Sequence, residues 1–537
     1  MSSSLQVLWI VVLLCASILA YAAASAVDDC ASFKLVNVTN TVVTSRTFYK
    51  TGDNVTVVNA VQSVSKNDLP AFCRIELTII TNATANSSAH TEVWLPEAWN
   101  TRLVTLGTGG FSGGAAVLDL AVTAVKQGYA GMSTDSGHQA DQADGSWAGP
   151  HNDNAIADYA WRAVHLSVLS AKEVVKQYYG REQKKSYFLG CSNGGRQGLK
   201  EVQDFPDDFD GVVVGSPANS FDRVLASIAH TAVLILPVNS SRSISEDTWT
   251  NVIHPEVLKQ CDVLDGVADG IISDPRVCSF RPETLTCLPQ QNTSTCLTLD
   301  QVDTLHKLYT DYYETNQTYV FGGFYPGGET GMLSSPPALP VVIDAYRYMI
   351  ANDTTWDLDR FDFSAILQAE FVFSAQMNAD SPNLTSFASG PHSGKIIHYV
   401  GWAENSIPAG GSLHYYETVH SWMRANVGSI DMDSFYRLFP VPGMQHCMGG
   451  FGPVSFGGGS QAGAGYPALK NDAEHDILAA MVRWVEDGVA PEAIIGTAYK
   501  NNTVAEGVAF TRPICKYPAT AIYHGGDVNK AASFRCV

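Results

Sequence analysis

Hydrophobic and polar positions alternate along the segment that follows Cys73 in two different rhythms. Residues 74–81 (RIELTIIT) and 90–96 (HTEVWLP) mix apolar and polar positions in a broadly alternating way, as strands of a half-exposed sheet do. Residues 158–180 (DYAWRAVHLSVLSAKEVVKQYYG) have helical apolar spacing, and Gly180 is a suitable end for that helix. The chain therefore predicts strands and helices in alternation.

Short apolar runs predict further, fully buried strands. These are residues 102–106 (RLVTL), which lead into a glycine-rich loop, residues 185–190 (KSYFLG) and residues 209–219 (FDGVVVGSPAN). A helix is predicted to start at residues 194–205 (GGRQGLKEVQDF), directly after the second run. This strand–helix order favours an α/β fold with a mainly parallel sheet covered by helices.

The rhythm breaks near residue 220 and returns near residue 394. Residues 220–393 are rich in Cys, Pro, Asn and turn signals, whereas residues 395–404 (KIIHYVGWAE) and 434–447 (SFYRLFPVPGMQHC) again contain core strands. We therefore predict a catalytic domain built from residues 27–219 and 394–537, with residues 220–393 inserted as a lid domain. The alternative is that residues 220–393 form an independent second domain.

Composition restricts the class of partner. With 537 residues and 45% hydrophobic positions the chain can bury a large core, so it is not a disordered protein. Its formal net charge of −20 argues against nucleic acid and anionic membranes, because both select a basic surface.

The N-terminus indicates secretion. An apolar run over residues 5–20 precedes Ala24-Ser25-Ala26, which is typical of a signal peptide covering residues 1–26; an uncleaved anchor helix is the alternative. The ten cysteines after Cys15 then lie in an oxidising compartment and are expected to pair. Glycosylation sequons are frequent, at Asn37, Asn54, Asn82, Asn86, Asn239, Asn316 and Asn383.

The pentapeptide from Gly190 to Gly194 has the pattern G-x-S-x-G between a predicted strand and a predicted helix. A tight turn in that context strains the backbone of Ser192 and exposes its hydroxyl above the sheet, so Ser192 is the candidate nucleophile. The alternative is an incidental glycine-rich turn. An oxyanion hole is expected from the backbone N–H groups of Asn193 and Gly110, with Gly109 as the next choice, unless the glycine-rich loop is only a flexible turn.

A serine nucleophile requires a base, which follows it in the chain order of α/β-hydrolases. His446 lies in a loop after a predicted strand and is the candidate. His475 lies at the predicted start of an amphipathic helix, where we expect it to cap the helix or face solvent.

Cys191 and Cys447 each adjoin one of the two candidate catalytic residues. A disulfide between them would hold their Cα atoms roughly 5.5–6 Å apart and so join the serine turn to the histidine loop. The alternatives are two unrelated buried thiols or pairing elsewhere.

Six segments together resemble the tannase/feruloyl esterase family. They are GCSNGGRQG (190–198), QHC (445–447), GTGGFSGG (107–114), STDSGH (133–138), CDVLDGVADG (261–270) and GWAE (401–404). The resemblance extends from about Cys30 to the C-terminus. It implies an α/β-hydrolase fold with a large inserted lid domain and supports the bridge between Cys191 and Cys447.

The resemblance also implies the acid of a catalytic triad. The family has an aspartate where this chain has Glu404, and glutamate can likewise orient and stabilise an imidazolium. Asp431 or Asp433 could supply the acid instead, or the enzyme could be impaired. Asp135 and His138 are expected to be structural supports.

A structural calcium site is the second implication. Its ligands would be the carboxylates of Asp262, Asp265 and Asp269 with the carbonyl oxygens of Val267 and Ile271; an acidic solvated turn is the alternative. Cys261 and Cys278 would clamp this loop. The remaining pairs would be Cys287–Cys296, Cys515–Cys536 and, by elimination, Cys30–Cys73.

The expected function is therefore that of a secreted serine esterase that cleaves feruloyl (hydroxycinnamoyl) esters of plant cell-wall polysaccharides through an acyl-enzyme. The alternatives are a tannase that hydrolyses galloyl esters and a catalytically silent, glycan-binding relative.

Overall fold

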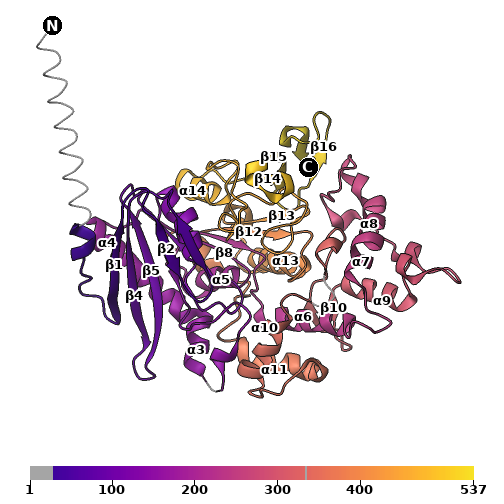
Figure 1. The fold of residues 1–537 in the computed structure, drawn as a ribbon, viewed down its shortest axis with the longest axis horizontal. Coiled ribbons are helices and arrows are strands. Elements are labelled where there is room, and N and C mark those ends of the chain that lie inside the picture. Colours follow the sequence, from indigo (N-terminus) through magenta and orange to yellow (C-terminus); the bar gives the residue numbers. More distant parts are fainter. Residues whose placement is uncertain (1–27, 151, 333–335) are drawn as a thin grey trace, which may run out of the picture.

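The protein is built around one nine-stranded sheet (Figure 1). A computed structural model describes residues 28–150, 152–332 and 336–537. The strand order is β1-β4-β5-β7-β6-β8-β9-β12-β13. These strands are β1 (Thr41–Tyr49), β4 (Phe72–Asn82), β5 (Ser87–Pro96), β6 (Arg102–Leu106), β7 (Ala130–Thr134), β8 (Lys185–Cys191), β9 (Gly211–Gly215), β12 (Lys395–Gly401) and β13 (Tyr436–Val441).

Parallel pairing runs from β7 to β13, and antiparallel pairing joins β1, β4, β5 and β7. The parallel strands are buried along almost their whole length, which explains their continuous apolar runs. On β4, by contrast, buried and half-buried positions alternate. The predicted α/β class with a mainly parallel sheet is confirmed.

Helices cover both faces of the parallel region. On one face lie α4 (Ala163–Tyr179), α5 (Asn193–Asp204) and α13 (Ala409–Asn426), which pack with Phe188 of β8. On the other face lie α14 (Ile477–Asp487) and a short helical segment over residues 117–127, which pack with Tyr187 and Leu189. As predicted, α4 ends at Gly180, whose φ of 68° places it in the left-handed region.

Residues 220–393 contribute no described strand to the nine-stranded sheet. Figure 1 shows their helices α8 and α9 on the opposite side of the molecule from β1, β4 and β5. Part of this region has its own apolar core, which includes Trp249, Ile253, Leu297 and Leu305. Strands β12 and β13 then return to the sheet beside β9, which is the arrangement an insertion produces.

Most of the remaining helices and strands are short, and the longest of them is α6 with 15 residues. The helices are α2 (Val117–Asp119), α3 (Asp153–Ala157), α6 (Phe221–Ile235), α7 (Glu246–Thr248), α8 (His254–Cys261), α9 (Leu299–Leu308), α10 (Leu339–Asp344), α11 (Phe363–Phe373) and α12 (Thr385–Ser389). The strands form four two-stranded sheets: β2 (Val55–Val58) with β3 (Ser63–Lys66), β10 (Tyr312–Tyr313) with β11 (Tyr319–Phe321), β14 (Ala493–Tyr499) with β15 (Val508–Cys515), and β16 (Ala521–Tyr523) with β17 (Phe534–Cys536).

All five expected disulfides are present. They are Cys30–Cys73, Cys191–Cys447, Cys261–Cys278, Cys287–Cys296 and Cys515–Cys536. This confirms the predicted connectivity.

The expected signal peptide, residues 1–26, lies outside the described residues. None of the helices in the described part of the chain combines the length and apolar character that a membrane span requires. Six of the seven sequon asparagines are exposed; the seventh, Asn82, is half-buried and donates from its side chain to Asn154.

Candidate active site

The candidate nucleophile lies on a strained turn between β8 and α5. Ser192 has φ 61° and ψ −123°, a conformation that L residues rarely adopt. Its N–H donates to Gly215 O at 2.9 Å, and its carbonyl accepts from Arg196 N and Ala218 N. These contacts over-determine the turn, as a strained functional residue requires.

Glycines make this turn sterically feasible. A Cβ atom on Gly190 would lie 2.6 Å from the carbonyl carbon and oxygen of Gly194, and one on Gly195 would lie 2.8 Å from Gly215 O. Helix α5 therefore packs directly on the ends of β8 and β9, which fixes where the helix starts. The glycines of the G-x-S-x-G pattern are explained by these close approaches.

The candidate base is held next to this turn by a disulfide. Cys191 and Cys447 are bonded, with their Cα atoms 6.0 Å apart, across a sequence separation of 256. Ser192 and His446 therefore occupy adjoining turns. Cys447 has φ 65°, and the loop that contains it is closed by Gln445 N donating to Gly449 O.

Glu404 lies against the candidate base. His446 Nδ1 is 2.5 Å from Glu404 Oε1, so Nδ1 carries the proton and Nε2 is left as the basic nitrogen. The other carboxylate oxygen accepts from the backbone N–H groups of Asn405, Ser406 and Ile407 at 2.9, 3.0 and 3.3 Å. The carboxylate of Glu404 thus caps the turn that directly follows it. These contacts accommodate the longer side chain of glutamate.

The loops that contain Glu404 and His446 are tied together. Ala403 N donates to Met444 O at 3.0 Å, and a Cβ atom on Gly401 would lie 2.1 Å from the same oxygen. Only a residue without a side chain permits this approach.

The carboxylate of Glu404 changes the pKa of His446. Burial lowers the pKa of this imidazole, but the charge of Glu404 and the hydrogen bond to it act in the opposite direction, and the net effect is a raised pKa. Glu404 is 3% exposed, so little water screens the pair. His446 is consequently a stronger base than an unpaired buried histidine.

The other candidate acids and the other candidate base lie elsewhere. Asp433 forms an ion pair with Lys516 at 2.5 Å, and Asp431 is exposed and accepts from Asp433 N. His475 bonds Asp472 and directly precedes Asp476, the N-cap of α14. The expectation that His475 caps the helix or faces solvent is wrong, because this residue is buried and Asp476 supplies the cap.

The expected oxyanion donors differ in how closely their surroundings are packed. Among the residues that the structure describes, the N–H groups of Asn193 and Gly110 have no protein acceptor. A Cβ atom on Gly109 would meet nothing within 4 Å, whereas one on Gly110 would lie 2.3 Å from Gln142 O. Gly109 therefore borders free space and Gly110 is packed; their roles stay a prediction.

Buried polar side chains that the sequence did not single out support the turn. Asn193 Nδ2 donates to Thr108 O at 3.1 Å, and Gln197 Oε1 accepts from Thr108 N at 3.1 Å. Arg196, which is fully buried, donates to Asn193 Oδ1 and to backbone carbonyls that include Ala160 O. No local pattern distinguishes Arg196, because polar residues in a helix ordinarily indicate a solvated face.

Two further residues were expected to be supports, and their contacts agree with that role. Asp135 accepts from His90 N and Gly137 N, and His138 contacts Phe111 O through Nε2 at 2.8 Å. His138 also stacks on Trp147.

The expected calcium loop contains oxygen donors, as calcium prefers. Asp262 and Asp265 are buried, and the carbonyl oxygens of Val267 and Ile271 accept no hydrogen bond from any described residue. Asp269 Oδ2 is 2.7 Å from Arg512 Nη2. The loop thus offers oxygen atoms of the type that calcium prefers, but a guanidinium neutralises one of its carboxylates, and calcium binding stays a prediction.

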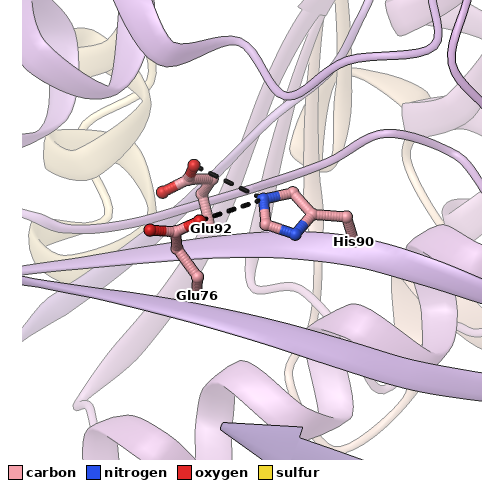
Figure 2. Close-up of side chains that lie close together, drawn as sticks. All are labelled: Glu76, His90 and Glu92. Carbon is pink, nitrogen blue, oxygen red and sulfur yellow. Dashed lines mark hydrogen bonds and ion pairs between the residues drawn. The ribbon is translucent and has the colours of Figure 1, made fainter. Parts of the chain in front are cut away.

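Two groups of potential metal-ligating side chains converge within 4.8 Å among the described residues, and the aspartates of the expected calcium loop belong to neither group. One is Glu76, His90 and Glu92, on the paired strands β4 and β5 (Figure 2). The other is His165, Glu201 and Asp208.

The sheet, the strained serine turn and the paired histidine define an α/β-hydrolase. The family described as "Tannase and feruloyl esterase" matches residues 73–537. "Probable feruloyl esterase B-1" of Aspergillus flavus is 37% identical over 495 residues, covering 90% of this chain and 89% of that protein. The chain therefore belongs to the tannase and feruloyl esterase family and is a carboxylic ester hydrolase.

Solved structures show the same relationship. The crystal structure of feruloyl esterase B from Aspergillus oryzae is 34% identical and has a TM-score of 0.87, covering 95% of this chain and 100% of that chain. A tannin acyl hydrolase from Aspergillus niger, with 19% identity and a TM-score of 0.71, shares the fold. The predicted fold and family are confirmed.

Removal of the bridge beside the candidate catalytic residues should impair activity specifically. We expect Cys191→Ala with Cys447→Ala to lower kcat/KM about 100-fold, because a displacement of about 1 Å between reacting groups costs that much. The control removes Cys30 and Cys73, which join β4 to the N-terminal segment. Ester hydrolysis and Tm should be measured for both. Equal kcat/KM in the two variants would contradict the expectation, whatever the change in Tm.

Neutralising Glu404 should slow the reaction and shift its pH profile. We expect Glu404→Gln to lower kcat by roughly 10³–10⁴, since the imidazole loses the partner that fixes its tautomer. Because Glu404 raises the pKa of His446, the acid limb of kcat/KM should move to lower pH in this variant.

Glu404→Asp is the matched control for that variant. It keeps the charge, so the acid limb should stay closer to that of the unmodified enzyme while kcat falls less. An unchanged pH profile and rate in Glu404→Gln would exclude Glu404 as the partner of the base.

Proposed function

We propose that this protein is a secreted serine esterase that cleaves feruloyl and related hydroxycinnamoyl esters of plant cell-wall polysaccharides. The observation that carries the proposal is the joint geometry of the strained Ser192 turn, the bridge from Cys191 to Cys447 and the hydrogen bond from His446 to Glu404. The similarity to proteins named feruloyl esterase B supports the substrate class. The five disulfides support an extracellular location.

In the proposed reaction His446 Nε2 takes the proton of Ser192 Oγ while that oxygen attacks the ester carbonyl carbon. The N–H groups of Asn193 and either Gly110 or Gly109 donate to the oxyanion of the tetrahedral intermediate. His446 then returns the proton to the leaving alkoxide as the bond from the acyl carbon to that oxygen breaks. A water molecule, deprotonated by His446, hydrolyses the acyl-enzyme and restores the Ser192 hydroxyl.

Glu404 stays ionised throughout this cycle. It accepts from His446 Nδ1 and so stabilises the imidazolium that forms when Ser192 loses its proton. The three backbone N–H groups that donate to its other oxygen keep the carboxylate in one orientation. The energetic role of Glu404 is therefore to favour the charged form of the base at the moment of attack.

The inserted region supports this arrangement from the other side of the active-site loops. Asn405 Nδ2 donates to Gly331 O at 2.9 Å, and a Cβ atom on Gly331 would lie 2.4 Å from the side chain of Gln445. Asn405 directly follows Glu404 and Gln445 directly precedes His446, so both loops contact Gly331. We propose that residues 220–393 act as a lid that borders the acyl pocket.

We also propose that the loop from Cys261 to Cys278 binds calcium. Asp262, Asp265 and Asp269 would hold the ion together with the carbonyl oxygens of Val267 and Ile271, and the ion would supply structural cross-linking within the lid. The unpartnered carbonyls and the buried carboxylates support this assignment.

Substitution of the nucleophile tests the proposed function. The unmodified enzyme should hydrolyse methyl ferulate faster than methyl gallate, and Ser192→Ala should lose at least about a thousandfold of that activity. p-Nitrophenyl acetate serves as an unselective ester control. Preference for the gallate would instead indicate a tannase, and absence of turnover on all three esters would indicate a catalytically silent protein.

Removal of calcium should destabilise the lid. We expect dialysis against EGTA to lower Tm by a few degrees and re-addition of Ca²⁺ to restore it, since an ion that binds only the folded state stabilises that state. Asp262→Asn should abolish the response to both treatments. An unchanged Tm in the unmodified protein after EGTA would refute the calcium assignment.

A further inference from the structure

A cluster remote from the serine turn combines three potential metal ligands from three elements. His165 lies on α4, Glu201 lies in the C-terminal half of α5, and Asp208 lies in the loop between α5 and β9. One ligand atom of each lies within 4.8 Å of the others. His165 Nδ1 is 2.7 Å from Asp208 Oδ2.

Glu201 is the unusual member of this cluster. It is 1% exposed, and neither of its carboxylate oxygens has a hydrogen-bond donor. Burying a carboxylate without a partner is costly, because the group loses its hydration and gains no hydrogen bond or counter-charge in return. The carboxylate of Glu201 therefore requires a cation or a proton beside it.

A shared proton would satisfy this requirement only in part. Burial and the nearby charge of Asp208 raise the pKa of Glu201 well above its ordinary value, so a proton can be held between the two carboxyl groups. One proton, however, provides a partner for one oxygen of Glu201 and leaves the other oxygen buried and unpaired. A divalent cation can bind both oxygens at once.

The carboxylates of the other cluster, which consists of Glu76, His90 and Glu92, do have partners. Glu92 is also buried, but both of its oxygens accept from Arg74, at 2.8 and 2.5 Å, and one of them also accepts from Trp94. Figure 2 shows His90 beside the two glutamates, with one ring nitrogen directed at both Glu76 and Glu92. Because Arg74 forms ion pairs with both Glu76 and Glu92, neither carboxylate of this cluster lacks a cationic partner.

We propose that His165, Glu201 and Asp208 form a binding site for a divalent transition-metal cation such as Zn²⁺. One imidazole nitrogen and two carboxylates are ligands that zinc accepts, with metal–ligand distances of about 2.0–2.2 Å. The two negative charges of the carboxylates balance the charge of the ion. Water completes the coordination shell from the side of His165, whose side chain is 20% exposed.

Other charged groups that face the cluster are compatible with the ion. Lys172 Nζ lies 3.6 Å from Asp208 Oδ1, and its side chain is 21% exposed, so it can turn to solvent when the ion enters. Asp204, the other nearby carboxylate, pairs with Lys200 at 2.9 Å. Binding of the ion would therefore replace the contact between Asp208 and Lys172.

The site would have a structural role. It would cross-link α4, α5 and the loop before β9, and α5 is the helix whose first residue directly follows Ser192. The ion would thus hold the far end of the helix that starts at the candidate nucleophile. This role does not depend on which ester the enzyme hydrolyses.

Zinc binding to the full-length protein tests the proposal. The protein is stripped with EDTA, returned to buffer with excess Ca²⁺ so that the lid loop is filled, and titrated with ZnCl₂ by calorimetry. We expect one zinc ion per chain and a rise in Tm of roughly 3 °C at zinc about a hundredfold above the dissociation constant. Glu201→Gln and His165→Gln should each weaken zinc binding at least about tenfold.

Glu76→Gln is the matched control, because it makes the same chemical change in the other cluster. This variant should bind zinc as the unmodified protein does. If Glu201→Gln fails to fold, His165→Gln decides, since His165 is partly exposed. The proposal is overturned if the unmodified protein takes up no zinc, if His165→Gln binds it with undiminished affinity, or if Glu76→Gln abolishes the binding.

Discussion

The bond between Cys191 and Cys447 is the constraint on which the active-site geometry depends. It joins two turns that are 256 positions apart in the sequence and holds their Cα atoms 6.0 Å apart. Each cysteine is the immediate neighbour in sequence of a candidate catalytic residue. The bridge therefore limits how far the turn of Ser192 can move from the loop of His446. In the chain-entropy description, closing a loop of this length stabilises the folded state by about 5 kcal/mol.

Hydrogen bonds from several segments hold the strained backbone at Ser192 in place. The backbone of Ser192 is held by Gly215, Arg196 and Ala218, while Asn193 and Gln197 bind the glycine-rich loop at Thr108. On the histidine side, the loop of Glu404 is bonded to the loop of His446 and also to Gly331 of the inserted region. The candidate catalytic groups therefore lie where three segments of the chain meet, and no single element positions them.

Local patterns in the sequence predicted the elements that depend on local physics. The apolar runs of β8, β9, β12 and β13, the end of α4 at Gly180 and the strand–serine–helix order follow from periodicity and turn chemistry. The pairing of cysteines and the contact of Glu404 with His446 followed from the family resemblance and from sequence adjacency. The catalytic roles of these residues and the domain boundaries at residues 220 and 393 stay predictions.

Features that depend on tertiary contacts could not be found in this way. Arg196 and Glu201 both lie on α5, where polar residues in a helix indicate a solvated face, yet both are buried against other elements. His475 was expected to cap a helix or face solvent, but its neighbour Asp476 takes the cap and His475 is enclosed. Arg196 is enclosed by distant segments such as the one around Ala160, whose proximity no local pattern encodes. His475 bonds Asp472, three residues earlier, and what the sequence could not show is that this turn is buried.

Labelling with a fluorophosphonate tests the central claim most directly, because the reagent reacts with a serine hydroxyl only where an adjacent base activates it. Peptide mass spectrometry should find one phosphonyl group, on Ser192, with the bridge from Cys191 to Cys447 intact. The labelling rate should fall when pH drops below the pKa of His446. A label on another residue, or a Ser192 that resists the reagent at every pH, would contradict the account.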